Sequence, residues 1–340
     1  MPVAVDAMGG DHAPDVVIQG ACEAQDRYGD LLRPILVGDQ QKLEEKLKSF
    51  GKNDELEIVH AAQQVAMDES GAGSFRKKRD SSLAVATRLV RDGSAKGVFS
   101  AGNTGAMVAS SLLNIGRIAG VSRPALATLI PTSRPSQPWV ILLDVGATAE
   151  CKALNLYQYA ILGELYARAL LKLEQPRVGL LNIGEESSKG TELAQEAHAM
   201  MQRRSAFIGN VEGQDILSGN ADVVVTDGFS GNVMLKFAES VWPFLGAVVR
   251  EEIGSNLQSK LGALMLKPSF KRLKTRMDYS EYGGAPLLGV NGISIVGHGR
   301  SDAKAVRNGI RFAAQLVRSG LNDAIRTELQ REEEGEVVNS

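Results

Sequence analysis

The sequence predicts an α/β protein built as a three-layer α/β/α sandwich. Five short apolar segments are each followed by a glycine-containing loop and then by a run of residues with helical periodicity. Glycine is abundant, with 36 residues, whereas aromatic residues make up only 5% of the chain. Many tight strand-to-helix turns would explain this composition, and strands that alternate with helices favour a sheet covered on both faces.

Five strand-loop-helix units follow one another along the chain. The predicted strands are 3–5, 97–99, 178–181, 223–225 and 293–296, and the loops that follow them are 6–14, 100–105, 182–190, 226–232 and 297–302. Ligands of such sheets bind beyond the carboxyl ends of the strands. We therefore expect all five loops to lie at one edge of the sheet.

The remaining segments suggest a single domain. A proline-rich loop at 130–138 joins two apolar segments and could be a hairpin or a loop at a domain edge. Residues 331–340 are acidic and polar, which predicts a disordered tail after a domain that spans residues 1–330. Loops 100–105 and 226–231 share a hydroxyl-x-Gly-x-x-Gly pattern, which indicates two similar halves around one cleft or simply two tight turns.

Charge, cysteine content and known motifs exclude several classes of protein. The formal net charge is −2, so no overall positive potential would attract nucleic acid. Two cysteines, Cys22 and Cys151, fit neither a disulfide framework nor a zinc site and are typical of a reducing cytosol. No secretory signal, no apolar run of roughly 18 residues and no Walker A motif are present, so we expect a cytoplasmic protein without metal or cofactor.

Loop 100–105 is a candidate anion site. The free N–H groups of a first helical turn point at an anion, and the helix dipole favours negative charge there. Gly102 and Gly105 would allow the backbone to approach a ligand closely, while Asn103 and Thr104 add side-chain donors. Plain helix capping is the simpler explanation for any single loop of this kind.

The other loops add charged candidates. Lys189 lies near a predicted helix start, where the dipole disfavours a cation unless an anion is bound, so we expect it to bind phosphate. Arg300 is a second candidate phosphate ligand. Glu185, Asp227 or His12 could act as a base, and their spacing does not choose among them. Together the candidates are, for catalysis, Asn103, Lys189, Asp227 and His12, and, for phosphate or substrate binding, Asp6, Gly9, Gly10, Gly102, Thr104, Gly105, Glu185, Gly228, Gly231, Asn232, His298 and Arg300.

The sequence indicates no covalent nucleophile. It contains no G-x-S-x-G motif, and Cys151 has no histidine near it in sequence, so an inert cysteine is expected. A basic run at 76–79 precedes a predicted helix cap at 80–82. A solvated surface, an acidic protein partner or a substrate phosphate would each explain this run.

Residues 254–278 predict a helical hairpin tip that contacts a membrane. No acidic residue lies between 256 and 277, whereas six lysines and arginines do. Pro268 should break this segment into two short amphipathic helices, and such basic, amphipathic helices are typical of interfacial anchors. Packing of the apolar stripes in the core or against a second copy is the alternative. The expected membrane contacts are Leu257, Leu261, Leu264, Met265, Phe270, Lys271, Leu273 and Lys274.

Seven motifs, taken in order, resemble those of the PlsX-type phosphate acyltransferases. They are residues 6–14 (DAMGGDHAP), 100–106 (SAGNTGA), 116–121 (GRIAGV), 179–186 (GLLNIGEE), 210–213 (NVEG), 226–233 (TDGFSGNV) and 282–289 (YGGAPLLG). One departure is residues 144–148 (DVGAT), where the family pattern has Asn in the last place and this chain has Thr148. Threonine keeps a hydrogen-bonding side chain there.

This resemblance implies transfer of a long-chain fatty acyl group from acyl-acyl-carrier-protein to inorganic phosphate. The acyl phosphate product would feed phospholipid synthesis. It also implies a homodimer with a fold related to phosphotransacetylases and isocitrate dehydrogenases, placed peripherally at the inner face of the cell membrane. A short-chain phosphotransacetylase that uses coenzyme A, a non-catalytic regulator that binds acyl carrier protein, and a nicotinamide dehydrogenase of related fold remain alternatives.

Overall fold

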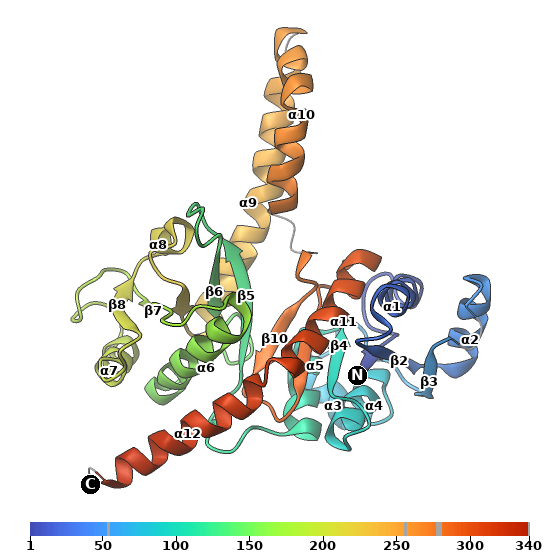
Figure 1. Ribbon diagram of the computed structural model, residues 1–340, viewed down its shortest axis with the longest axis horizontal. Helices are drawn as coiled ribbons and strands as arrows, with labels where there is room; N and C mark the ends of the chain where they lie inside the picture. The colour runs from blue at the N-terminus through green and yellow to red at the C-terminus, as the bar shows by residue number, and fades with distance from the viewer. Residues whose placement is uncertain (53–54, 255–256, 277–280, 339–340) are drawn as a thin grey trace.

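The computed structural model, shown in Figure 1, describes residues 1–52, 55–254, 257–276 and 281–338. Its described strands form one sheet in the order β3-β2-β1-β4-β11-β10-β5-β6-β9-β7-β8. The strands are β1 Pro2–Asp6, β2 Arg33–Gly38, β3 Glu57–His60, β4 Gly97–Ser100, β5 Ala125–Pro131, β6 Trp139–Leu143, β7 Val178–Leu181, β8 Phe207–Val211, β9 Val223–Val225, β10 Ala285–Leu288 and β11 Ile293–Val296.

Helices cover both faces of this sheet. Alternate residues of β1 enter different cores, because side chains of a strand point alternately to its two faces. Val3 and Val5 pack in one buried cluster and Ala4 packs in the other, which confirms the expected layers. The helices are α1 Asp15–Tyr28, α2 Gln40–Ser49, α3 Gly71–Lys77, α4 Ser82–Arg91, α5 Thr104–Ser110, the π-helical turn η1 Ser111–Ile115, α6 Ala153–Leu171, α7 Glu192–Met201, α8 Gly213–Ser218, α9 Gly228–Gly254, α10 Leu257–Arg276, α11 Ala303–Arg318 and α12 Leu321–Val338.

The expectation that all five loops share one edge of the sheet is wrong. Strands β1, β4 and β11 are parallel to one another, and so are β6, β9 and β7. Three antiparallel pairings, β11–β10, β10–β5 and β5–β6, separate the two blocks. An odd number of reversals makes the two blocks run in opposite senses. Sheet twist over the four steps from β4 to β6 then turns the blocks by roughly 90° relative to each other.

The proline-rich loop at 130–138 connects a β-hairpin. Strands β5 and β6 pair antiparallel from Ala127 opposite Leu143 to Pro131 opposite Trp139. This hairpin supplies one of the three reversals described above. The sheet therefore changes direction within a single continuous layer.

Pro268 does not break the predicted hairpin tip. Helix α10 runs from Leu257 to Arg276 with Pro268 inside it, and α9 and α10 project from the body as one long pair of helices (Figure 1). A proline removes the hydrogen bond to the carbonyl four residues earlier, which here belongs to Leu264. Leu264 is 65% exposed, so water can satisfy that carbonyl and the helix can continue.

The predicted disordered tail is also corrected. Helix α12 continues to Val338, so residues 331–338 are helical. Arg204, which is mostly buried, pairs with Glu164 of α6 and with Glu328 and Glu332 of α12. The pairs with Glu328 and Glu332 attach α12 to the body, and composition alone could not reveal them because Arg204 lies more than one hundred residues before these two partners. Among the described residues, no helix is long and apolar enough to cross a membrane.

Candidate active site

The loops after β1, β4 and β11 form a first cluster of candidate residues. Gly9 lies against the β4–α5 loop so closely that a Cβ on it would stand 2.9 Å from the Gly102 nitrogen. Gly10 faces both Ala101 and the carbonyl of Gly299, with a backbone φ of +120° that favours glycine. Because β1, β4 and β11 are neighbouring parallel strands, their loops meet at one edge.

Asp6 joins two of these loops and does not face solvent. Its Oδ2 accepts a 2.7 Å hydrogen bond from the Ser100 hydroxyl, which itself accepts one from the Gly102 N–H. Its Oδ1 accepts one from the Met8 N–H at 3.3 Å. Burial raises the pKa of Asp6, while these donors act in the opposite direction. The position fits a residue that holds the loops in place, and not one that binds substrate.

Asn103 has a structural role that the sequence did not reveal. Its Oδ1 accepts the Ala106 N–H and so caps α5, which bears out the simpler explanation for this loop. Its amide nitrogen donates to the carbonyls of Met67 and Glu69 at 2.9 and 2.8 Å. These bonds occupy the donors that we expected substrate to use. Thr104 and Gly105 remain exposed beside them.

Residues 66–79, here called the flap, cover the start of α5. Gly71 lies against it so closely that a Cβ there would stand 2.2 Å from the carbonyl carbon of Gly105. Glu69 holds the flap together, because its carboxylate accepts the Ala66 N–H, the Ser74 hydroxyl and the Lys78 ammonium. The hydrogen bond from Lys78 is the main reason that the pKa of Glu69 falls to about 2.

We expect Glu69→Gln to loosen the flap at neutral pH. A depressed carboxyl pKa means that the charged form stabilises the fold above the ordinary pKa of 4.5, and that this contribution is lost as the pH falls towards about 2. Glutamine imitates the protonated form, so amide hydrogen exchange within the flap should become faster. Glu57→Gln, which breaks only an exposed ion pair with Arg33, is the control and should leave that exchange unchanged.

The loops after β6 and β9 form a second cluster around Asp144. This carboxylate is fully buried and accepts four backbone N–H groups at 2.7–3.1 Å. Burial raises its pKa, and the four N–H donors oppose that shift. The donors are Leu126, Gly146, Ala147 and Thr148. Asp144 therefore fixes the β6–α6 loop and the start of β5 by a single side chain.

The candidates Gly228 and Gly231 pack directly on this group. The N–H of Gly228 donates to the carbonyl of Thr148, and a Cβ on Gly228 would stand 2.5 Å from that oxygen. A Cβ on Gly231 would stand 2.0 Å from the Asp144 carbonyl oxygen. These two glycines therefore allow the first turn of α9 to approach β6. The Thr148 hydroxyl has a separate partner, because it donates to the carbonyl of Pro124 at 3.3 Å.

Asp227 and Asn232 differ in how much they can offer a ligand. The Asp227 carboxylate accepts the N–H groups of Phe229 and Ser230 at 3.0 and 2.8 Å, so it already caps the start of α9. Asn232 is exposed next to Gly146 and is open to a ligand. Of these two, Asn232 is the better placed to bind a substrate oxygen.

Lys189 and Glu185 lie on the β7–α7 loop, at the same edge as the second cluster because β7 pairs with β9. Both side chains are exposed. Helix α7 begins at Glu192 and is capped by the Thr191 hydroxyl, so Lys189 precedes the helix and does not begin it. The electrostatic argument for Lys189 from the helix dipole is therefore weaker than the sequence indicated.

His12, His298 and Arg300 belong to the first cluster. His12 and Arg300 are exposed, on loops joined by the hydrogen bond from the Asp11 N–H to the Gly299 carbonyl. The Arg300 N–H donates to His298 Nδ1 at 3.1 Å, which fixes the imidazole against its own loop. The candidate residues thus divide between two clusters, and the contacts described above run within each one.

Asp144 and Ser100 are the main structural residues that the sequence analysis missed. Asp6 and Asp144 occupy equivalent positions. Asp6 lies at the carboxyl end of β1 and Asp144 at that of β6, and each strand has a parallel neighbour, β4 or β9, that is followed by a hydroxyl-x-Gly-x-x-Gly loop. The repeated loop pattern could therefore have directed attention to the residue after each partner strand. This equivalence supports the interpretation of two similar halves.

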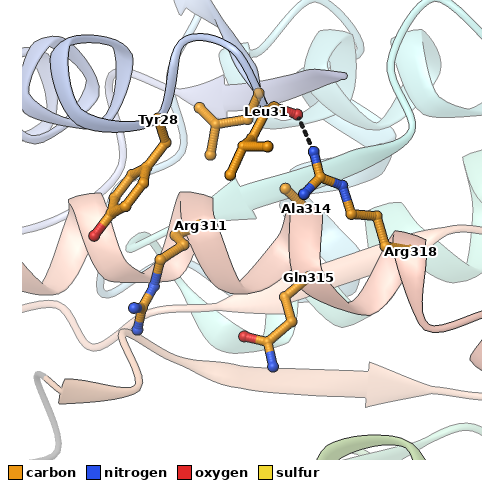
Figure 2. A pocket seen from close by; sticks show the side chains of 7 residues that line it. Tyr28, Leu31, Arg311, Ala314, Gln315 and Arg318 are labelled. Carbon is orange, nitrogen blue, oxygen red and sulfur yellow. Dashed lines mark hydrogen bonds between the residues drawn. The ribbon is translucent and has the colours of Figure 1, made fainter.

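Two hollows in the described surface lie away from these loops. The hollow in Figure 2, of about 230 Å³, lies between the end of α1 and α11. Arg318 donates to the Leu31 carbonyl there at 2.8 Å. The lining residues are Tyr28, Leu31, Leu32, Arg311, Ala314, Gln315 and Arg318. The other, of about 420 Å³, contains two carboxylates that would repel phosphate; it is lined by Asp39, Gln40, Gln41, Glu44 and His60. We assign the chemistry to the loop clusters, which stand at strand ends.

Neither cysteine is activated. Burial raises the pKa of Cys22 to about 11 and also raises the pKa of Cys151, so both remain thiols at neutral pH. The Cys151 thiol donates to the Thr148 carbonyl at 3.4 Å, within the second cluster. Within the described ranges, no group of three or more His, Cys, Asp or Glu side chains is arranged to hold a metal ion.

Solved structures of a phosphotransacetylase and a phosphotransacylase share this fold. A phosphotransacetylase from Streptococcus pyogenes superposes with a TM-score of 0.63 at 18% identity, over 94% of each chain. A branched-chain phosphotransacylase from Enterococcus faecalis gives 0.60 at 14% identity, over 93% of this chain and 99% of the other. Identities this low show the fold alone. The structural similarity agrees with the expected architecture.

Sequence comparisons are far closer. A phosphate acyltransferase of Heliobacterium modesticaldum is 49% identical over 96% of both chains. Those of Nostoc sp. and Geobacter sulfurreducens are 46% and 45% identical, covering 93% and 98% of this chain and 92% and 95% of theirs. The family model described as "Fatty acid synthesis protein" matches residues 1–324. The chain therefore belongs to the phosphate acyltransferase family, the PlsX-type acyltransferases that its motifs resemble.

Proposed function

We propose that this enzyme transfers a long-chain fatty acyl group from the thioester of an acyl carrier protein to inorganic phosphate, giving acyl phosphate for phospholipid synthesis. The observation that carries this proposal is the near-full-length identity to phosphate acyltransferases. The arrangement of the loops supports it, since both clusters of glycine-containing turns stand at the carboxyl ends of parallel strands, where such sheets bind ligands.

The chemistry requires positioning more than activation. A phosphate oxygen attacks the thioester carbonyl, the carbon–sulfur bond breaks, and the carrier thiolate leaves and takes up a proton. Phosphate is already a competent oxygen nucleophile at neutral pH, so no covalent enzyme intermediate is needed. The enzyme must bind an anion and stabilise the oxyanion, and each well-placed donor can contribute about 3–4 kcal/mol. Lys189 and Asn232 have the exposed polar ends that this requires.

The test supplies palmitoyl carrier protein and phosphate and traps the acyl phosphate with hydroxylamine. We expect release of the carrier thiol that depends on phosphate, together with a hydroxamate product. An acyl-enzyme formed without phosphate would contradict direct attack. Turnover of acetyl-coenzyme A without turnover of the long-chain substrate would instead identify a short-chain phosphotransacetylase.

Lys189→Ala should raise the KM for phosphate about tenfold or more, because a charge-assisted contact to an anion would be lost. The side chain is exposed and no ion pair in the described part of the chain involves it, so folding should be unaffected. Lys48→Ala, which changes another exposed lysine, on α2, is the control. An unchanged phosphate titration for Lys189→Ala would remove this residue from the site.

Peripheral membrane contact through α10 is part of the proposal. Leu261, Leu264 and Met265 are 65%, 65% and 80% exposed, and Leu266 and Phe270 are also exposed. The helix contains no acidic residue, and a helix that combines basic and apolar residues in this way suits the surface of an anionic bilayer. Each cation adds at most about 1 kcal/mol, which predicts reversible, salt-sensitive binding. Lys271 is exposed as expected, whereas the side chains of Leu257, Leu273 and Lys274 lie outside the described residues.

A double variant, Leu261→Glu/Leu264→Glu, should lose co-sedimentation with anionic vesicles. Wild-type protein should bind anionic vesicles more strongly than neutral ones. Leu113→Glu/Leu217→Glu is the matched control, because these leucines are 62% and 57% exposed but lie away from the hairpin. Undiminished binding by the tip variant, or equal binding of wild type to both kinds of vesicle, would show that α10 is not the anchor.

The proposal also includes a homodimer. One face of α9 exposes apolar side chains at helical spacing, with Phe229, Phe237 and Phe244 each more than 60% exposed. The remaining members of this face are Val233 and Val248. Apolar surface of this kind usually marks an interaction site, and a second copy of the chain would cover it. Sedimentation equilibrium of wild type and of Phe237→Glu would test this, with a monomeric wild type as the contrary result.

A further inference from the structure

The outer side of the flap carries three cations that have no assigned role. Arg76, Lys77 and Arg79 are exposed, and among the described residues none of the three forms an ion pair. Their neighbour Lys78 is different, because its ammonium pairs with Glu69 and also donates to the Gln64 carbonyl. Lys78 thus stabilises the flap, whereas the other three are available to a partner.

The flap holds these cations next to the first cluster. Asn103 binds two carbonyls of the flap, and Gly71 packs on Gly105 at the start of α5. Helix α3, which contains Arg76 and Lys77, packs against α5. A partner that binds the outer side of the flap would therefore stand directly beside the first of the two loop clusters to which we assign the chemistry.

We propose that Arg76, Lys77 and Arg79 form the docking surface for an acidic face of the acyl carrier protein. The inference rests on the function proposed above. The chain as a whole has a net charge of −2, so this local positive patch is not part of a general positive field. Complementary charges at the rim of an interface raise the association rate and orient the partner. The docked carrier could then deliver its thioester to the neighbouring cluster.

A membrane is a poorer occupant of this patch. Figure 1 shows α3 and α10 at opposite ends of the molecule, so the flap and the hairpin tip cannot contact one flat bilayer together. Among the described side chains of the flap, Met67 is the one large apolar residue that is exposed, so the flap lacks the apolar stripe that α10 presents and that an interfacial segment requires. An acidic protein surface needs only complementary charge.

The test compares two thioesters of the same acyl chain, one on the carrier protein and one on uncharged N-acetylcysteamine. For the variant Arg76→Gln/Lys77→Gln/Arg79→Gln we expect kcat/KM to fall about tenfold with the carrier substrate at low salt. The small thioester should react as with wild type, and the salt dependence of the carrier reaction should weaken. The matched control is Lys48→Gln/Lys96→Gln/Arg203→Gln, three exposed cations on other surfaces, which should change neither substrate.

Several results would overturn the docking surface. Equal loss with both thioesters would place the three residues in the reaction site or in folding. A raised KM for phosphate in the variant would identify a phosphate site, and reduced vesicle binding would identify a membrane contact. Unchanged kinetics with the carrier substrate would show that the three cations have no role in binding the carrier protein. Calorimetric binding of the carrier protein to wild type and variant separates this question from turnover. If neither thioester yields acyl phosphate with wild type, the proposed function fails, while docking is still decided by the calorimetry.

Discussion

Gly231→Ala is expected to abolish most activity and to destabilise the fold. The new Cβ would stand 2.0 Å from the carbonyl oxygen of Asp144 and 2.8 Å from Cγ2 of Thr226. The backbone cannot easily yield, because the Asp144 N–H donates to the Thr226 carbonyl and its side chain binds four amides. Overpacking of this kind costs about 1–3 kcal/mol or more. A displacement of about 1 Å at the loop could lower the rate about 100-fold.

Helix α9 also provides the control for this variant. Gly246 lies in the same helix, and a Cβ there would meet only the end of the flexible Arg250 side chain at 4.0 Å. Gly246→Ala should therefore stabilise the protein by about 0.5–1 kcal/mol, because glycine is unfavourable inside a helix. Thermal unfolding and steady-state rates measure both variants. Wild-type activity and stability for Gly231→Ala would disprove the tight approach of α9 to β6.

The layers of the fold could be predicted from the sequence because periodicity is a local property. The strand-loop-helix units lie close to their predicted positions. Of the two alternatives for residues 130–138, a hairpin or a loop at a domain edge, the structure has the hairpin, between β5 and β6. Strand direction is not local. Strand β10 pairs with both β11 and β5, and β5 is separated from it by more than one hundred residues. The reversal between the two parallel blocks therefore could not be read from the sequence.

Local sequence rules fail at two places in this chain, where solvent or tertiary contacts decide the structure. Pro268 ends a helix when the orphaned carbonyl is buried, but Leu264 is exposed and the helix continues. Acidic residues after 331 suggested disorder, but Glu332 pairs with Arg204 and helps to hold α12. Solvent decides the first case and a side chain distant in sequence decides the second.

The site could be located but its residues could not be sorted. Glycine-containing loops identified both clusters, since close backbone approach is visible in the residue types. The amide of Asn103 is an obvious donor in sequence, yet the carbonyls of Met67 and Glu69 use it. Asp144 was overlooked because a carboxylate that accepts four backbone N–H groups has no signature in the sequence.

Asp144→Asn should be much more harmful than Asp6→Asn. Both changes remove a buried negative charge at the carboxyl end of a strand, so the difference between them reports the hydrogen bonds. The Oδ2 of Asp144 accepts the Thr148 N–H and its Oδ1 accepts three others. An asparagine has one acceptor oxygen, so its amide N–H₂ must face a backbone donor and leave it unpaired, which costs about 1–3 kcal/mol.

Asp6 meets an adjustable group at one of its two oxygens, because Oδ2 accepts the Ser100 hydroxyl whereas Oδ1 accepts the Met8 backbone N–H. Its side-chain partners are the hydroxyls of Ser82 and Ser100, which can rotate to accept a hydrogen bond from an asparagine amide. We therefore expect the free energy of unfolding, measured in urea, to fall by about 1–3 kcal/mol more for Asp144→Asn than for Asp6→Asn. Asp323→Asn, which alters only an exposed ion pair with Arg326, should remain within about 0.5 kcal/mol of wild type. Equal losses at the two buried positions would mean that charge burial, and not the number of backbone donors, sets the stability of the two clusters.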